Sequence, residues 1–224
     1  MNDSPNFPAE SGPLLLQGPA GVLEAFVELP VAEHARRGIA VICHPHPPDG
    51  GTMSNKVVTT MVRALAELGI ASVRFNFRGV GQSQGEYDQG RGETLDLLAV
   101  SQWAIAQRPG DAFWLAGFSF GAWVALRAAR QLPVQQMVAI APPVGFRDFT
   151  GVPPPPCPWL VVQGDADDVV DPLKVFEWVA AADNPPTLVR MADAGHFFHG
   201  RLVDLRGAIK NGVRKQLPPH RSVG

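Results

Sequence analysis

Six short apolar runs, separated by segments with helical periodicity, constrain the fold of this chain more than any other feature of its sequence. Runs that are apolar at nearly every position are typical of strands buried on both faces. In most of the intervening segments, apolar residues recur at intervals of three and four, as on an amphipathic helix. This alternation predicts an α/β fold with a mostly parallel sheet and helices on both of its faces. The predicted strands are Ile39–Cys43, Ala71–Phe77, Ala112–Ala116, Gln136–Ile140, Trp159–Gln163 and Thr187–Met191.

An antiparallel hairpin is predicted ahead of these strands. Leu14–Leu16 and Val22–Leu29, in which apolar residues partly alternate, flank a turn at Gly18–Gly21. Two such runs joined by a short turn of glycine and proline are typical of a hairpin, and we expect it at the edge of the sheet. With this hairpin the predicted sheet has eight strands.

The length of the chain is that of a single domain. Of its 224 residues, 46% are hydrophobic, which is enough for a large core. We expect the domain to span residues 13–212. Residues 1–12 are polar and interrupted by prolines, so we expect a flexible amino-terminal tail there and a carboxyl-terminal tail over residues 213–224.

Charge and hydropathy exclude several kinds of partner. A net charge of -2 and a pI near 6.3 provide no basic surface that would attract nucleic acid or an anionic membrane. The first residues lack the basic and apolar regions of a secretion signal, and no apolar run is long enough for a transmembrane helix. Cys43 and Cys157 belong to opposite edges of the predicted parallel sheet, so we expect free thiols. These features favour a cytoplasmic protein.

One strand-to-helix junction carries a pattern with chemical meaning. Gly117-Phe118-Ser119-Phe120-Gly121 follows an apolar strand and precedes the helical segment 122–130. A serine between two glycines at such a junction lies on a sharp turn that exposes its hydroxyl above the sheet. The alternative is an ordinary turn. We predict that Ser119 is a catalytic nucleophile.

A second segment, Gly81-Gln82-Ser83-Gln84-Gly85, matches the same G-x-S-x-G pattern. It continues into the polar segment Glu86–Gly90 instead of a helix. Because the pattern places a nucleophile only where a strand turns into a helix, Ser83 is predicted to be a loop residue.

Six histidines are candidates for the general base. His196 follows the last predicted strand, in a loop that would place its ring over the sheet, and we predict that it is the base. His199 is the nearest alternative and is expected within the last helix. His34 and His220 lie in a predicted loop and tail, so we expect both to be solvated.

The acid that orients the base is expected in the loop after Trp159–Gln163, which contains four aspartates. Asp165 belongs to a tight turn, and Asp171 precedes a proline as a helix cap. This leaves Asp167 and Asp168, of which we choose Asp167. A metal site is the alternative for a carboxylate cluster, but the spacing and central glycine of a calcium-binding loop are missing.

The oxyanion formed during acyl transfer needs two N–H donors. The residue after the nucleophile, Phe120, is expected to supply one, and the loop after Ile39–Cys43 the other. Pro45, Pro47 and Pro48 have no N–H, so His46 is the only possible backbone donor among residues 45–48. His44 and His46 also form an H-x-H pair, but no third ligand lies nearby in the sequence. We therefore predict neither a metal nor a cofactor.

Together these motifs resemble the α/β-hydrolase superfamily, and in particular small bacterial serine hydrolases with an HPHP…GGTM-x-NK loop. The resemblance covers about residues 13–212 and implies a Ser119, Asp167 and His196 triad. It favours Asp167 over Asp168, because the acid of the family usually stands three residues after a glycine, here Gly164. Where the family commonly has His-Gly, this chain has His44-Pro45. The matching segments are His44–Pro47, Gly50–Met53, Asn55-Lys56, Arg74–Ser83, Gly117–Gly121, Gly164–Asp167 and Gly195–Phe198.

Many proteins of this superfamily carry a helical lid after the sixth strand. Here that place is taken by residues 141–158, of which seven are proline, so no helical lid can form. Within it, Val152–Pro158 is expected to be a polyproline connector, with a PxxP docking motif as the alternative. We therefore expect Ser119 to face open solvent and the substrates to be small. Candidates for an apolar acyl pocket, for which core packing is the alternative, are Met53, Phe118, Phe120, Trp123, Val170 and Phe197.

These expectations combine into a lidless serine hydrolase. The most specific reading is a carboxylesterase that cleaves short-chain acyl esters through an acyl-enzyme. A serine peptidase or amidase with the same triad is the first alternative. A non-catalytic binding protein on a hydrolase scaffold is the second.

Overall fold

A computed structural model describes residues 5–221. These residues form one eight-stranded sheet with the order β1-β2-β4-β3-β5-β6-β7-β8. Strands β3 to β8 are parallel to one another, while β1 and β2 form an antiparallel hairpin and β2 pairs antiparallel with β4. The predicted sheet is confirmed. The strands are β1 Gly12–Gly18, β2 Gly21–Glu28, β3 Gly38–Cys43, β4 Ala71–Phe75, β5 Ala112–Phe118, β6 Val134–Ile140, β7 Trp159–Gly164 and β8 Thr187–Met191.

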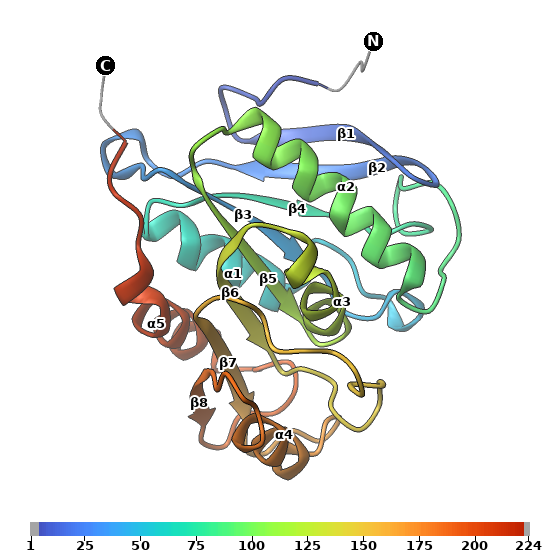
Figure 1. The fold of residues 1–224 in the computed structure, drawn as a ribbon, viewed down its shortest axis with the longest axis vertical. Coiled ribbons are helices and arrows are strands. Elements are labelled where there is room, and N and C mark those ends of the chain that lie inside the picture. The colour runs from blue at the N-terminus through green and yellow to red at the C-terminus, as the bar shows by residue number, and fades with distance from the viewer. Residues whose placement is uncertain (1–4, 222–224) are drawn as a thin grey trace.

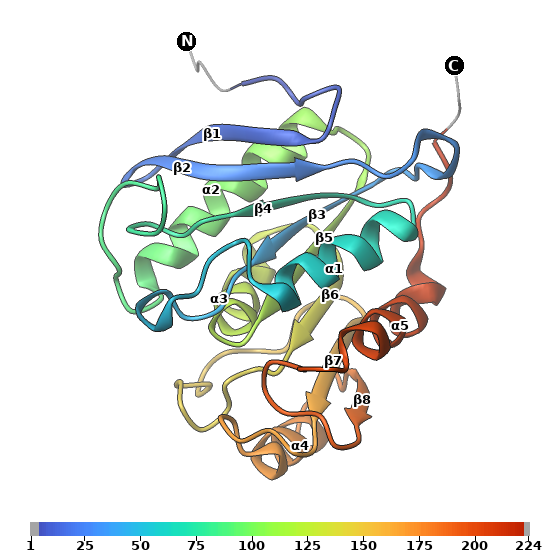
Figure 2. The same cartoon turned by 180° about the vertical axis from the view of Figure 1, so that it is seen from behind.

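Helices cover both faces of the sheet, as predicted. Helices α1 and α5 lie on one face, and α2 and α3 lie on the other (Figures 1 and 2). The buried residues of α4 belong to the same apolar cluster as those of α2 and α3. The helices are α1 Lys56–Glu67, α2 Arg91–Gln107, α3 Phe120–Ala128, α4 Pro172–Ala180 and α5 Leu202–Val213.

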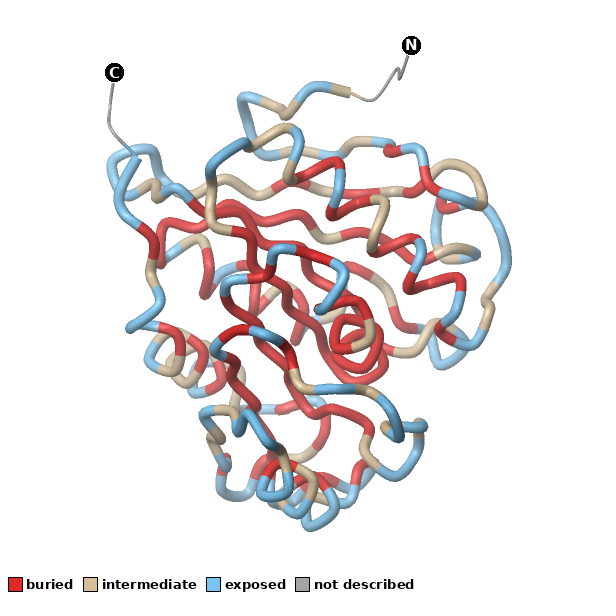
Figure 3. The backbone as a smooth tube through the Cα atoms, viewed as in Figure 1, coloured by how far each residue is buried: buried red, intermediate tan, exposed pale blue. Residues whose placement is uncertain are grey.

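Two apolar cores, one on each face, explain why the central strands are apolar at every position. Alternate residues of β3 enter opposite cores: Val41 packs with α2 and α3, and Ile42 packs with α1 and α5. All six residues of β3 are buried, and the central strands are buried along their length (Figure 3). The sheet is therefore a rigid platform, and the loops at its carboxyl edge are held by buried strands.

Both ends of the described chain pack against the domain. Phe7 stacks on Trp103, and its N–H donates to Gln107 at 3.0 Å. At the other end, α5 runs to Val213, and the N–H of Arg221 donates to Ala35. Some residues of the two predicted tails, 1–12 and 213–224, therefore contact the domain, and the tails stay a prediction. Residues 1–4 and 222–224 lie outside the described residues.

The segment 141–158 contains no helix, in agreement with the prediction that no helical lid forms there. Its second half is an extended connector into β7. The carbonyl of Pro154 accepts a hydrogen bond from Arg130, and that of Pro155 accepts one from Asn184. These contacts support the connector reading of the prolines.

Two further observations concern the described residues as a whole. None of the helices between residues 5 and 221 combines the length and the hydropathy that crossing a bilayer would require. Cys43 and Cys157 are both buried and unpaired. Burial raises the pKa of Cys157 to about 11 and that of Cys43 still further.

Candidate active site

Ser119 lies at the sharp turn between β5 and α3. Its φ of 52° and ψ of -120° are values that a residue with a side chain rarely adopts. The flanking glycines make the turn possible: a Cβ on Gly117 would lie 2.4 Å from the backbone of Gly121, and one on Gly121 would lie 2.5 Å from the carbonyl oxygens of Cys43 and His44. The amino end of α3 is thereby drawn against the carboxyl end of β3.

The structure brings Ser119, His196 and Asp167 together from three different loops. Oγ of Ser119 lies 3.1 Å from Nε2 of His196, and Nδ1 of the same ring lies 2.9 Å from Oδ2 of Asp167. All three side chains are buried. The turn after β7 and the loop after β8 can meet because Gly164 has no Cβ: one placed there would lie 2.0 Å from the carbonyl oxygen of Ala194.

Asp167 is held as an ionised acceptor. Burial alone raises its pKa, but the pKa lies below its ordinary value because His196, the N–H of Val170 and Nε2 of Gln163 all donate to the carboxylate. A carboxylate only accepts, so Nδ1 of His196 carries the ring proton. Nε2 of the neutral ring is then free to accept the proton of the Ser119 hydroxyl.

The other aspartates of this loop have different surroundings. Oδ1 of Asp165 accepts the N–H of Asp193, which ties the two turns together. Asp171 caps α4 by accepting the N–H of Leu173. Asp168 is exposed, so Asp167 is the only buried member of the four.

The structure also places the histidines and the serine that competed for catalytic roles. His199 lies before α5 begins and not within it, since the loop after β8 extends to residue 201. His34 and His220 are exposed, as expected. Ser83 is buried and donates to the carbonyl of Asn76 while accepting the N–H of Glu24. Its hydroxyl is committed to joining loop and strand, which agrees with its predicted loop role.

Phe120 and His46, the two predicted oxyanion donors, are both close to Ser119: Phe120 follows it in the chain, and His46 lines the same cavity. Phe120 is the first residue of α3, so its N–H has no partner within the helix. The carbonyl of His46 accepts from the N–H groups of Asp49 and Gly51. Among the recorded contacts of residues 5–221, neither the N–H of Phe120 nor that of His46 donates to a protein acceptor. Both donors are thus available.

His44 is occupied on both ring nitrogens. Nδ1 donates to the carbonyl of Pro45 at 2.7 Å, and Nε2 accepts the N–H of Phe77 at 3.0 Å. Burial lowers the pKa of His44 to about 4. The His44-x-His46 pair therefore does not present two free ligands. Within the part of the chain that is described, no group of three or more His, Cys, Asp and Glu side chains could hold a metal ion.

A cavity of about 110 Å³ adjoins the Ser119 hydroxyl. Ser119 lines this cavity and is only 9% exposed. Its hydroxyl is therefore less open to solvent than we expected from the missing lid. Loops after β3, β7 and β8 form the walls. The lining residues are Pro45, His46, Asp49, Gly50, Gly51, Asn55, Ser119, Val169, His196 and Phe197.

Of the predicted pocket residues, only Phe197 lines the cavity. Phe118, Phe120 and Val170 are almost fully buried, and Met53 and Trp123 are less than 10% exposed. Phe118, Phe120, Trp123 and Val170 pack within the two cores, which was the alternative for each, and Met53 is buried outside the two core clusters. The neighbouring residue Val169, 43% exposed, takes the place at the cavity that was predicted for Val170.

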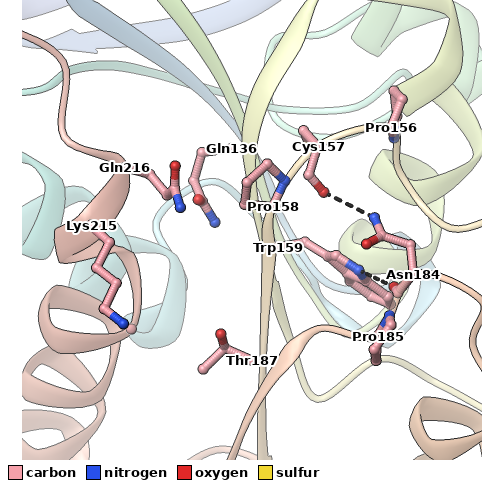
Figure 4. Close-up of a pocket in the computed structure, with 11 residues that line it drawn as sticks. Gln136, Pro156, Cys157, Pro158, Trp159, Asn184, Pro185, Thr187, Lys215 and Gln216 are labelled. Atoms are coloured by element: carbon pink, nitrogen blue, oxygen red, sulfur yellow. Dashed lines mark hydrogen bonds between the residues drawn. The ribbon is translucent and has the colours of Figure 1, made fainter.

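A larger cavity, of about 450 Å³, lies at the opposite edge of the sheet (Figure 4). It is bordered by the amino ends of β6, β7 and β8, at Gln136, Trp159 and Thr187. Nε1 of Trp159 donates to the carbonyl of Asn184 at 2.8 Å beside it. Because the Ser119 group is at the carboxyl edge, this cavity does not belong to that site.

Sequence reasoning missed Gln163, the residue that supports the carboxylate from below. It is fully buried, and its Nε2 donates to Oδ2 of Asp167 at 2.8 Å. A single glutamine at the end of an apolar strand was the signal that could have identified it, because a buried amide requires a hydrogen-bond partner.

Comparisons with known proteins place the fold among known families. Residues 21–152 match the model of the family described as X-Pro dipeptidyl-peptidase (S15 family). An α/β serine hydrolase without lid from Xanthomonas campestris is 54% identical, covering 97% of this chain and 100% of its own, with a TM-score of 0.94. An α/β serine hydrolase homologue from Coxiella burnetii is 46% identical, covering 92% and 99%, with a TM-score of 0.88.

A curated relative extends the likeness to a third bacterium. An uncharacterized protein of Rickettsia prowazekii is 34% identical over 208 residues, which are 88% of this chain and 87% of the relative. The family match covers more than half of the chain, and the first two likenesses cover nearly all of it. The chain belongs to the α/β-hydrolase superfamily, in the family described as X-Pro dipeptidyl-peptidase (S15 family), and shares the fold of its lidless serine hydrolases.

Proposed function

We propose that the protein is a carboxylesterase that cleaves short-chain acyl esters through an acyl-enzyme on Ser119. The observation that carries this proposal is the continuous hydrogen-bonded series from the Ser119 hydroxyl through the His196 ring to Asp167. A serine hydroxyl is a weak nucleophile unless a base accepts its proton, and this arrangement supplies the base and its orienting acid.

The reaction follows from these positions in two halves. Oγ of Ser119 attacks the acyl carbon while its proton passes to Nε2 of His196, and the N–H groups of Phe120 and His46 stabilise the carbonyl oxygen as it becomes negative. The bond to the alcohol then breaks, and His196 gives the proton to the departing alkoxide. Water then attacks the acyl carbon of the acyl-enzyme while giving a proton to Nε2 of His196. The bond from the acyl carbon to Oγ of Ser119 breaks, His196 returns the proton to this oxygen, and the carboxylic acid is released.

The cavity beside Ser119 supports a small acyl group. At about 110 Å³ it is well below the roughly 300–1,000 Å³ of sites that enclose drug-sized ligands. Its walls are apolar on one side, at Val169 and Phe197, and include the polar loop around Asp49 on the other. An acetyl or butyryl group suits such a space. The two unpaired cysteines are consistent with the cytoplasmic location that we propose, which cell fractionation would test.

Turnover of p-nitrophenyl acetate tests the proposal. The wild type should hydrolyse the ester, and Ser119→Ala should lose at least about 10³-fold in kcat, since the acyl-enzyme can no longer form. Ser83→Ala is the matched control, because it removes the serine of the second G-x-S-x-G segment and should retain activity. Equal activity of Ser119→Ala and wild type would refute the proposal.

A second candidate function is favoured by the family description, which names a dipeptidyl-peptidase acting at X-Pro. The same triad can cleave an amide, provided that the leaving amine receives the proton from His196. Parallel assays with p-nitrophenyl acetate and an aminoacyl-prolyl anilide separate the two: a higher kcat/KM for the anilide would replace the esterase with a peptidase. Inactivity on both, with no labelling by a serine-directed probe, would leave a binding protein on a hydrolase scaffold.

A further inference from the structure

Four side chains from three loops form a hydrogen-bonded series close to the nucleophile. Nη2 of Arg147 donates to the hydroxyl of Tyr87 at 3.2 Å, and this hydroxyl lies 2.8 Å from Nε2 of His46. Nδ1 of His46 lies 2.8 Å from Oδ2 of Asp49. Tyr87 is the only tyrosine of the chain.

The chemistry of these groups gives the hydrogen bonds one direction. The Asp49 carboxylate can only accept, so Nδ1 of His46 carries the ring proton and Nε2 of the neutral ring accepts. The guanidinium of Arg147 can only donate, so it occupies a lone pair of the Tyr87 oxygen. The phenolic proton of Tyr87 is therefore directed at His46. The His46 ring is held from both sides.

The same side chains pack against the residue that follows the nucleophile. The ring centroid of Phe120 lies 5.3 Å from that of His46 and 6.0 Å from that of Tyr87. The guanidinium carbon of Arg147 lies 5.1 Å from the centre of the Phe120 ring. The two residues whose backbone N–H groups we assign to the oxyanion hole are thus in side-chain contact, and Tyr87 touches both.

The backbone of His46 has one polar group left for a substrate. Its carbonyl accepts from Asp49 and Gly51, and its ring is held as described, whereas its N–H has no recorded acceptor among residues 5–221. A donor stabilises an oxyanion only when it is oriented in advance. The Pro45–His46 peptide unit is held at its carbonyl by Nδ1 of His44. The fixed His46 ring restrains the same unit on the side of its N–H.

We infer that Tyr87 is a positioning residue of the oxyanion hole, whose hydroxyl fixes the His46 ring and through it the His46 peptide N–H. This inference rests on the proposed function of Ser119. It assigns a role to the loop between β4 and α2, which carries Tyr87. It also assigns one to the segment 141–158, which carries Arg147.

A double-mutant cycle with p-nitrophenyl acetate tests this role. Tyr87→Phe should lower kcat about tenfold and change KM less than about twofold, because a misplaced oxyanion donor weakens transition-state binding more than ground-state binding. His46→Ala keeps the peptide N–H but lacks the ring, and should lose a similar factor. In the His46→Ala background, Tyr87→Phe should have no further effect, since Tyr87 acts only through that ring.

Controls separate this inference from the proposed function. Glu86→Gln changes an exposed side chain next to Tyr87 in the same loop, and should keep kcat within about twofold of wild type. An unchanged kcat in Tyr87→Phe, or equal losses in both backgrounds, overturns the inference and leaves Ser119-dependent hydrolysis intact. Activity in Ser119→Ala refutes the proposed function instead. Independently of turnover, the ¹⁵N signal of His46 Nε2 should shift in Tyr87→Phe, and an unshifted signal overturns the inference.

Discussion

His44 and His196 show how hydrogen-bond partners separate two buried histidines into different roles. Both rings lie at the carboxyl edge of the sheet, and each Nδ1 is paired with an oxygen. Nε2 of His44 accepts a backbone N–H, that of Phe77, so the ring supports the loop that it begins. Nε2 of His196 instead faces the hydroxyl of Ser119. Only the second arrangement can accept a proton from a reacting group.

The first prediction concerns stability as a function of pH. Burial lowers the pKa of His44 to about 4 from an ordinary value of 6.5. The folded state therefore binds fewer protons than the unfolded state between these values, so the contribution is fully present above pH 6.5 and is lost as the pH falls toward 4. The loss should amount to about 3 kcal/mol, measured as the free energy of unfolding in urea from pH 8 to pH 4.

Variants identify the residue responsible for this pH dependence. His44→Gln should flatten the fall in unfolding free energy between pH 6.5 and 4, whatever its effect on the stability at pH 8. His34→Gln, at an exposed histidine, should leave the fall unchanged. The same slope in His44→Gln and wild type would show that other groups cause it.

At the scale of elements, the close approach of α3 to β3 determines the geometry of the nucleophile. The first turn of α3 packs against the carbonyl oxygens of Cys43 and His44 at the end of β3. Only a glycine at position 121 allows this approach, because a Cβ there would lie 2.5 Å from both oxygens. The same approach brings the amino end of α3 close to the loop after β3, and these are the two segments from which we propose the oxyanion donors. Helix and strand thus form one rigid unit.

The second prediction follows from this contact. Gly121→Ala should destabilise the protein by about 1–3 kcal/mol, because the new methyl group has to displace buried backbone, and should lower kcat on p-nitrophenyl acetate at least about tenfold. Gly207→Ala is the matched control: nothing lies within 4 Å of a Cβ at this position in α5, so it should raise stability by up to about 1 kcal/mol and leave kcat unchanged. Unfolding curves and kinetics measure both, and a fully active, stable Gly121→Ala would contradict the account.

The order of strands and helices was predictable from the sequence. The exact ends of the strands were not, nor were the hydrogen bonds between segments distant in the sequence. The pattern of apolar residues revealed every strand, but β5 extends two residues beyond the predicted Ala116, since its pairing with β6 continues to Phe118. Strand β4 ends two residues early, because Phe77 donates its N–H to His44 instead of a strand. Such contacts join distant segments, and local pattern does not encode them.

The candidate site divides in the same way. Ser119, Asp167 and His196 were identified because each follows a predicted strand, and parallel strands bring their carboxyl ends to one edge. Tyr87 and Gln163 were missed, since their roles depend on which side chain faces them across the fold. The apolar pocket was misplaced because a large apolar residue near a nucleophile, such as Phe118, is equally suited to the core.

At the scale of the whole molecule, the candidate catalytic residues meet at the carboxyl edge of the sheet, and the cavity beside them is small. Loops after β3, β5, β7 and β8 meet around a cavity of about 110 Å³, while residues 141–158 add no helical cover. A long acyl chain would therefore extend over exposed surface, where burial contributes little. This limited space is the reason that we propose small acyl groups as substrates.

The third prediction concerns acyl chain length. Across p-nitrophenyl esters from acetyl to dodecanoyl, kcat/KM should be highest between acetyl and butyryl and at least about tenfold lower at dodecanoyl. Monomeric substrate concentrations are needed throughout the series. A value that rises with chain length would show that the exposed side chains near the cavity, Val169 and Phe197 among them, form a binding surface for long chains.

The central claim is that Ser119 is the activated nucleophile, and covalent labelling with a fluorophosphonate probe tests it most directly. Mass spectrometry of the labelled, digested protein should find a single adduct on the peptide that contains Ser119, and Ser119→Ala should not be labelled. Labelling should also fall sharply in His196→Ala, which lacks the base. An adduct on Ser83, or no adduct in the wild type, would contradict the account.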